Sequence, residues 1–191
     1  MNISYKLRKF SKKDIDSLTK HANNSNIAKW LTNEFPHPYY RKDAETFIEF
    51  VSRENPPSVL TVEINKEACG AIGITVPKEN NNNSHDTKET TVENDESQGT
   101  PLIICDKQGE LGYWLSEKYW NKGIMTSAIK KMVEYGFKTF DIDCIFATPF
   151  VENVKSQKVL KKVGFVYNKK IQRIIKSDET YEVSIFSIKK D

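Results

Sequence analysis

The sequence predicts an α/β (α+β) fold, with about seven strands and helices between them. Three observations indicate it. Residues 110–137 have the pattern of a buried strand, a tight turn and an amphipathic helix. Residues 145–165 have the pattern of a strand, a capped helix and the start of another strand. Residues 59–76 and 165–188 alternate apolar and polar side chains around turn-forming residues, which is typical of antiparallel hairpins.

The composition is that of a globular protein. Of the 191 residues, 38% are hydrophobic, and 29 basic side chains against 26 acidic ones give a formal net charge of +3. This length suits a single domain over residues 1–191. The N-terminus lacks the apolar core of a secretion signal and no stretch is long enough to span a membrane. There is also no basic-aromatic motif of nucleic-acid binding, so we expect neither membrane nor nucleic-acid partners.

The cysteine pattern favours a reducing compartment. Cys69, Cys105 and Cys144 are odd in number and far apart, and the chain has only three histidines. We therefore expect no metal site, no disulfide framework and a cytoplasmic protein.

The N-terminal part predicts one strand and several helices. Residues 3–10 alternate as a strand does. Residues 13–50 follow a helical pattern in two or three pieces, interrupted at Asn23-Asn24-Ser25 and at Phe35-Pro36-His37-Pro38.

A hairpin and then an insertion follow. The two strands of the hairpin are expected at Val59–Glu63 and Gly70–Val76. Residues 78–100 contain four consecutive asparagines, six acidic and two basic side chains and one aliphatic residue. Such a segment has too little apolar surface to order itself, so we interpret it as a mobile low-complexity insertion in a hairpin loop. A strand is expected to resume at Leu102–Cys105.

The turn between the predicted strand Glu110–Leu115 and the following helix is a candidate phosphate site. The N-terminus of a helix presents unpaired backbone N–H groups and a partial positive charge, so it attracts anions. Gly123 allows close approach, and the Lys122 ammonium lies within reach. The alternative is that Gly123 only relaxes the turn. The residues of the candidate site are Lys122, Gly123, Ile124, Met125 and Thr126.

This stretch resembles the acetyl-CoA-dependent N-acetyltransferase superfamily called GNAT. The pyrophosphate loop of that family reads Gln/Arg-x-x-Gly-x-Gly/Ala. The frame Trp120-Asn121-Lys122-Gly123-Ile124-Met125 keeps the central glycine and departs at the outer positions. The form Trp-x-Lys-Gly-x-Met-Thr is similar to the branch of ribosomal-protein N-terminal (alanine/serine) acetyltransferases, as are residues 26–32 and 35–39.

The resemblance covers roughly residues 3–77 and 109–188. It implies a mixed, mostly antiparallel sheet whose central parallel strands splay apart. Pro149 late in the second of these strands, and Gly112 as a bulge in the first, fit such an opening. A proline on an edge strand is the alternative for Pro149. The resemblance also implies acetyl-CoA as cosubstrate and a primary amine as acceptor in a ternary complex. A protein N-terminal α-amine is favoured over a small-molecule amine or polyamine.

A second candidate site lies at Asn153–Phe165. Asn153 suits a helix N-cap and Gly164 a left-handed C′ residue. Asn153 and Ser156 match an Asn and a Ser of the resembled family. In that family these two residues also touch the pantetheine arm and the leaving sulfur. The alternative for Asn153 is a cap alone.

Acetyl transfer needs a neutral amine, a polarised thioester carbonyl and a proton for the leaving thiolate. The resemblance implies that the backbone N–H of Leu115 holds the carbonyl and that Glu110 accepts the amine proton. An ordinary charge at a strand edge is the alternative for Glu110. Many members of the family have a tyrosine that protonates the thiolate, and the aligned position here is Leu160. Ser156 or a water would then protonate the thiolate, or the thiolate would leave unassisted.

A rival interpretation is a non-catalytic acyl-CoA-binding or partner-binding module. It rests on the missing acid at Leu160 and on the two departures in the phosphate loop. Under either interpretation we expect a monomer or a homodimer.

Overall fold

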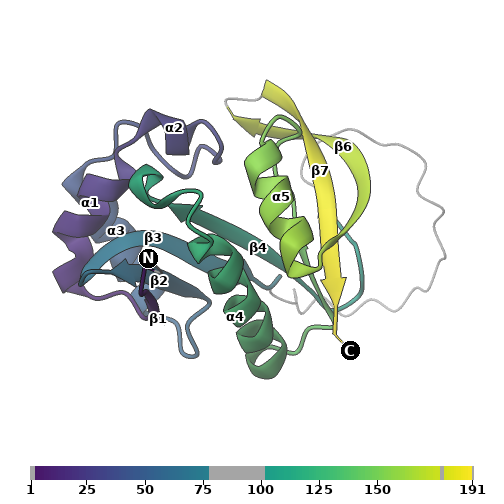
Figure 1. Ribbon diagram of the computed structural model, residues 1–191, viewed down its shortest axis with the longest axis horizontal. Helices are drawn as coiled ribbons and strands as arrows, with labels where there is room; N and C mark the ends of the chain where they lie inside the picture. The colour runs from purple at the N-terminus through teal and green to yellow at the C-terminus, as the bar shows by residue number, and fades with distance from the viewer. Residues whose placement is uncertain (1–2, 78–101, 177–178, 191) are drawn as a thin grey trace, which may run out of the picture.

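The computed structural model describes residues 3–77, 102–176 and 179–190. They form a seven-stranded sheet in the order β1-β2-β3-β4-β5-β7-β6, with helices packed against it (Figure 1). The only parallel neighbours among the described strands are β4 and β5. The predicted mixed, mostly antiparallel sheet is therefore confirmed. The insertion predicted at 78–100 lies outside the described residues.

The strands are β1 (Lys6–Arg8), β2 (Val59–Ile64), β3 (Glu67–Thr75), β4 (Gln108–Leu115), β5 (Cys144–Ala147), β6 (Val166–Lys176) and β7 (Glu179–Lys189). The helices are α1 (Ile15–Ala22), α2 (Ser25–Ala28), α3 (Arg41–Ser52), α4 (Ile124–Thr139) and α5 (Val154–Val163), with 3-10 turns η1 (Lys12–Asp14) and η2 (Glu117–Tyr119). Within the described residues no helix is long and apolar enough to cross a membrane.

Two apolar clusters lie on the two faces of the sheet. On β4, Leu111 and Leu115 pack in a cluster with α4 and α5, whereas Trp114 packs in a second cluster with α1 and α3. This alternation is what the pleat of a strand requires. Ile129 on α4 is fully buried, and burial of such a side chain contributes about 1.5–3 kcal/mol. The first cluster fixes α4 and α5 on the sheet, and this in turn fixes the ends of these two helices.

The central strands separate as the resemblance implied. Pairing between β4 and β5 covers only Gln108 to Glu110 against Cys144 to Phe146. Beyond this point β4 continues to Leu115, whereas the chain after β5 turns to β7, where the Pro149 carbonyl accepts a bond from Ser184 N at 2.9 Å. The bulge predicted at Gly112 is wrong, because Gly112 pairs with Gly73 in an unbroken register between β4 and β3.

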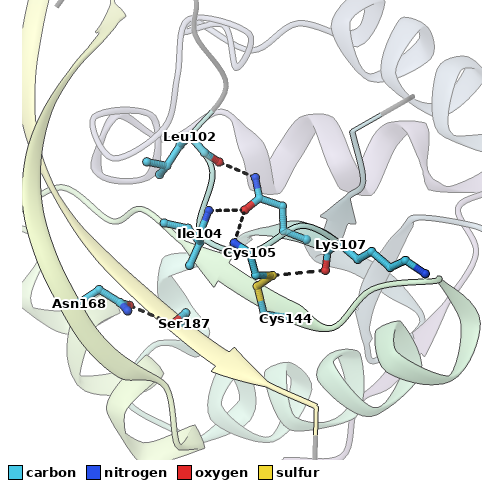
Figure 2. The surroundings of a disulfide bond; sticks show 8 residues. Leu102, Ile104, Cys105, Lys107, Cys144, Asn168 and Ser187 are labelled. Atoms are coloured by element: carbon cyan, nitrogen blue, oxygen red, sulfur yellow. Dashed lines mark hydrogen bonds between the residues drawn. A yellow bond between two sulfur atoms is a disulfide. The ribbon is translucent and has the colours of Figure 1, made fainter. Parts of the chain in front are cut away.

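The strand predicted at Leu102–Cys105 is also wrong. The backbone N–H groups that would pair with a neighbouring strand bind the side chain of Gln108 instead. Gln108 Oε1 accepts hydrogen bonds from Ile104 N at 2.6 Å and from Cys105 N at 3.3 Å (Figure 2). The segment is therefore folded around one glutamine, and β4 begins only at that residue.

The prediction that the cysteines form no disulfide is wrong. Cys105 and Cys144 are joined, with a Cα–Cα distance of 6.6 Å (Figure 2). The parallel register pairs Cys144 with Gln108, and Cys105 lies three residues before Gln108. Sequence separation concealed a contact that strand pairing creates.

Candidate functional site

A cleft of about 2000 Å³ opens where β4 and β5 separate. Its walls come from the outer half of β4, the turn before α4, the start of α5 and the segment from α2 to α3. Every residue predicted for the site lines it: Glu110, Leu115, Lys122, Gly123, Ile124, Met125, Thr126, Asn153 and Ser156. Segments more than 30 residues apart in sequence thus meet in one cavity.

The N-terminus of α4 fits an anionic group. Gly123 is its N-cap with φ of 73°, a left-handed conformation that favours glycine. The bond from Ser127 N to Gly123 O, at 3.1 Å, opens the helical ladder, so the amides of residues 124–126 precede it. A Cβ at Gly123 would meet no atom within 4 Å. The turn therefore presents backbone donors beside open space, as a phosphate requires.

Two lysines add positive charge to this end of the cleft. Lys122 Nζ lies 5.6 Å from the ring centroid of Tyr119, and Lys155 Nζ lies 5.0 Å from that of Trp120. All four side chains belong to residues that line the cleft. Sequence reasoning missed Lys155, because a lysine in the first turn of a helix has no distinctive pattern.

The backbone N–H of Leu115 faces the open edge of β4. Ser116 N donates to Cys69 O on the β3 side at 2.7 Å. Successive N–H groups of a strand point to opposite edges, so that of Leu115 points to the side from which β5 has withdrawn. The Leu115 carbonyl accepts a bond from Trp120 Nε1 at 2.7 Å, which fixes the strand end against the turn.

At the start of α5, Asn153 is the N-cap that the sequence predicted. Its Oδ1 accepts a bond from Ser156 N at 3.1 Å. The helix ends at Gly164 with φ of 112°, also as predicted. Leu160 is fully buried in the core, so this position offers no proton donor.

Tyr113 is a polar residue of the cleft that sequence reasoning missed. Its hydroxyl lies 2.7 Å from Ser156 Oγ. Burial raises the pKa of Tyr113 to about 12, although the hydrogen bond with Ser156 acts in the opposite direction. The hydroxyl is therefore protonated at neutral pH. Strand alternation places Tyr113 on the same face as Leu111 and Leu115, but it gives no hint of Ser156.

Glu110 is engaged by two partners. Its Oε1 accepts bonds from Thr148 Oγ1 at 2.7 Å and from Arg173 Nη1 at 3.1 Å. Arg173 Nη1 also lies 3.1 Å from Thr148 Oγ1. The Glu110 side chain keeps 36% of its surface exposed. An incoming amine can therefore approach this carboxylate, but it competes with Arg173. Arg173 arrives from β6, and no local pattern predicts that contact.

An aromatic surface completes the cleft on the α2 side. The rings of Trp30 and Phe150 have centroids 6.4 Å apart, and Tyr181 on β7 packs on Phe150 at 5.1 Å. Trp30 and Phe150 line the cleft. This apolar wall also has a charged neighbour, because Lys29 Nζ lies 5.2 Å from the ring centroid of Trp30.

Another polar cluster lies outside the cleft. His21, Glu67 and Cys69 place three metal-ligand atoms within 4.8 Å of one another. However, His21 Nε2 pairs with Glu67 at 2.8 Å and His21 Nδ1 with Ser116 Oγ at 3.1 Å. The Lys20 ammonium also lies 2.9 Å from Glu67. Occupied nitrogens and a nearby ammonium disfavour a cation, so we assign this cluster a structural role.

The chain is similar to known acetyltransferases in sequence and in fold. A family profile described as "Acetyltransferase (GNAT) domain" matches residues 5–166. YdaF of Bacillus subtilis (strain 168), named as a candidate ribosomal N-acetyltransferase, is 31% identical over 65 residues. That alignment covers 34% of this chain and 36% of YdaF, so it spans about a third of that relative's length.

Solved structures show the same fold over nearly the whole chain. The microcin C7 self-immunity acetyltransferase MccE, in complex with acetyl-CoA and AMP, has a TM-score of 0.70 at 20% identity, covering 97% of this chain and 92% of that one. RimL, a ribosomal L7/L12 alpha-N-protein acetyltransferase in complex with coenzyme A, has a TM-score of 0.71 at 12% identity, covering 97% and 94%. At these identities the likeness concerns the fold alone.

Proposed function

The chain belongs to the GNAT acetyltransferases, and on this premise we propose that it is an acetyl-CoA-dependent N-acetyltransferase acting on a primary amine. The observation that carries the proposal is the cleft itself. It combines an anion-accepting helix N-terminus at Gly123, a free-edge backbone donor at Leu115 and a carboxylate at Glu110. The first two groups suit a cofactor with a charged pyrophosphate and a reactive thioester. The carboxylate suits an amine that must lose a proton.

Each group has a task in direct transfer within a ternary complex. Acetyl-CoA supplies an activated acetyl group as a thioester. The amides of residues 124–126, with Lys122, hold the pyrophosphate, and Asn153 contacts the pantetheine arm. The N–H of Leu115 polarises the thioester carbonyl. Glu110 accepts the proton of the amine after Arg173 has given way, and the Ser156 hydroxyl donates a proton to the sulfur.

We propose a protein N-terminal α-amine as the acceptor. At pH 7 an α-amine with a pKa near 8 is neutral about one time in ten, whereas a lysine near 10.4 is neutral about once in 2,500. The difference is a penalty of roughly 3 kcal/mol. Glu110 already shares its charge with Arg173, so the site is better suited to an amine that is readily neutral. The apolar wall at Trp30 and Phe150 would take the first side chains of the peptide.

A matched pair of peptides tests this preference. One peptide has a free N-terminus and no lysine, and the other has the same sequence with a blocked N-terminus and one lysine. We expect acetylation of the first, detected by mass spectrometry, and a lower rate after Glu110→Gln. Equal or faster modification of the lysine peptide would contradict the α-amine preference, and a small amine or polyamine would then be tested.

A second candidate function is a non-catalytic acyl-CoA-binding module. The ion pair between Glu110 and Arg173 favours it, because a base that is held by an arginine is not free to accept a proton. Binding of acetyl-CoA without thiol release, across peptides, polyamines and small amines, would support it. Turnover that falls in Glu110→Gln would end it.

We propose that the protein works in the cytoplasm as a monomer or homodimer. The absence of a membrane-spanning helix among the described residues is compatible with this proposal. A reducing compartment would keep Cys105 and Cys144 as thiols. Cys144 is buried in the folded protein, so alkylation in freshly lysed cells under denaturing conditions tests this. Labelling of both cysteines supports the proposal, and protection of both argues for an oxidising compartment.

A further inference from the structure

The contact between Tyr113 and Ser156 crosses the opening between β4 and α5. Tyr113 lies on β4 beyond Glu110, the last residue that pairs with β5. Ser156 lies in the first turn of α5. Their hydroxyl oxygens are 2.7 Å apart and both residues line the cleft. This polar contact therefore spans the place where the two central strands have separated.

Either hydroxyl can be the donor in this contact. Tyr113 keeps its proton at neutral pH, because burial raises its pKa to about 12. The other acceptor near that proton is the Ser156 carbonyl oxygen, at 3.5 Å, which is long for an O–H donor. Ser156 Oγ is therefore the nearer of the two acceptors for the Tyr113 proton. Ser156 N is already bonded to Asn153 Oδ1, so backbone and side-chain oxygen of Ser156 are both held.

From these contacts the geometry points to Tyr113 as a positioning residue, which holds the Ser156 hydroxyl so that its proton is directed at the sulfur leaving group. This inference rests on the proposed function. In the proposed arrangement Tyr113 donates to Ser156 Oγ, so the proton of Ser156 is free to point into the cleft. Without Tyr113, the serine hydroxyl is free to turn back to a carbonyl in the preceding turn, as serines near helix starts do.

The amine nitrogen forms a bond to the acetyl carbon, and the C–S bond breaks with its electron pair going to sulfur. The sulfur takes the proton of the Ser156 hydroxyl, and Ser156 Oγ regains a proton delivered from solvent through the cleft. Tyr113 keeps its own proton throughout. The excess proton of the amine goes to Glu110, which returns it to solvent, so the net products are an amide and a thiol.

Three variants and one control test the role. They are Tyr113→Phe, Ser156→Ala, the double variant, and Tyr135→Phe. The control removes a tyrosine hydroxyl that donates to Pro57 O at 2.9 Å, outside the cleft. Melting temperatures check the fold of each variant. Steady-state kinetics gives kcat and the KM for acetyl-CoA, and ultraviolet absorbance of the thiolate gives the pKa of the CoA thiol in the binary complex.

In Tyr113→Phe we expect kcat to fall about a hundredfold, with KM for acetyl-CoA unchanged and the pKa of bound CoA raised. Ser156→Ala should behave in the same way. The double variant should be no slower than Ser156→Ala, because the two hydroxyls act as a unit. Tyr135→Phe should match the wild type in kinetics.

Two results would overturn the inference. One is a Tyr113→Phe variant with wild-type kcat and an unchanged pKa of bound CoA. The other is a double variant whose loss equals the product of the two single losses. A wild-type protein that binds no CoA and acetylates no amine is a different result, since it removes the proposed function itself and the inference with it.

Discussion

At the scale of single residues, Gly123 has two properties that an anion site requires. It has a left-handed backbone, and open space where a Cβ would be. Aspartate and asparagine both tolerate this conformation better than other residues and have nearly the same shape. We expect Gly123→Asp to weaken acetyl-CoA binding at least about tenfold more than Gly123→Asn, or roughly 1.4 kcal/mol. Titration calorimetry measures both, with melting temperature as the control for folding. Equal affinities of the two variants would contradict a phosphate site at this turn.

The lowered pKa of His21 leads to a prediction for the pH dependence of stability. Burial lowers the pKa of His21, although the hydrogen bond to Glu67 acts against it. The unfolded chain then takes up the proton at a higher pH than the folded protein does. Stability is therefore complete above the unfolded value of 6.5 and is lost as pH falls below it.

We expect the melting temperature to drop between about pH 7.5 and pH 5.5, and to drop less in His21→Gln. The control is His37→Gln, since His37 is exposed. The same slope in wild type and His21→Gln would show that other groups set this pH dependence.

Sequence patterns predicted residues whose role is local. Gly123 and Asn153 were predicted because a glycine before a helix and an asparagine at its N-cap act on their neighbours in the chain. Tyr113, Lys155 and Arg173 could not be predicted, since each acts through a partner on a distant element. The disulfide was missed for the same reason: Cys105 meets Cys144 only through the pairing of β4 with β5.

At the scale of elements, the start of α5 allows the two roles of Asn153 to be separated. Replacing an N-cap by alanine costs about 1 kcal/mol. We expect Asn153→Ala to lower the melting temperature and Asn153→Asp to retain it, because the carboxylate still accepts the bond from Ser156 N.

If Asn153 also touches the pantetheine arm, both variants should raise the KM for acetyl-CoA, since neither keeps the amide N–H₂ donor. A normal KM in Asn153→Asp would leave Asn153 as a cap alone.

The order and pairing of elements were predictable where periodicity and turn chemistry agree. The β2–β3 hairpin turns at Asn65 and Lys66, with φ of 52° and 67°, and α4 follows the predicted apolar stripe. Predictions were wrong at Leu102–Cys105 and at Gly112, because an apolar run and a single glycine occur in several kinds of structure. At Leu102–Cys105 the Gln108 side chain binds the backbone in place of a neighbouring strand. At Gly112 the strand pairing is regular.

At the scale of the whole molecule, the sheet and cleft are complete within the described residues. The insertion 78–100 carries six acidic and two basic side chains, and we propose that it is dispensable. Replacing it by a short Gly-Ser turn should leave the melting temperature and the affinity for acetyl-CoA unchanged at low salt. Tighter and less salt-sensitive binding after deletion would show that the acidic segment competes for the phosphate site.

The central claim is that the cleft between β4 and β5 binds acetyl-CoA for transfer to an amine. Titration calorimetry of the full chain with acetyl-CoA, and separately with CoA, tests it most directly. We expect saturable binding of both ligands below millimolar concentration, with weaker binding in Gly123→Asp. Failure of both ligands to bind below millimolar concentration to a folded protein would contradict it.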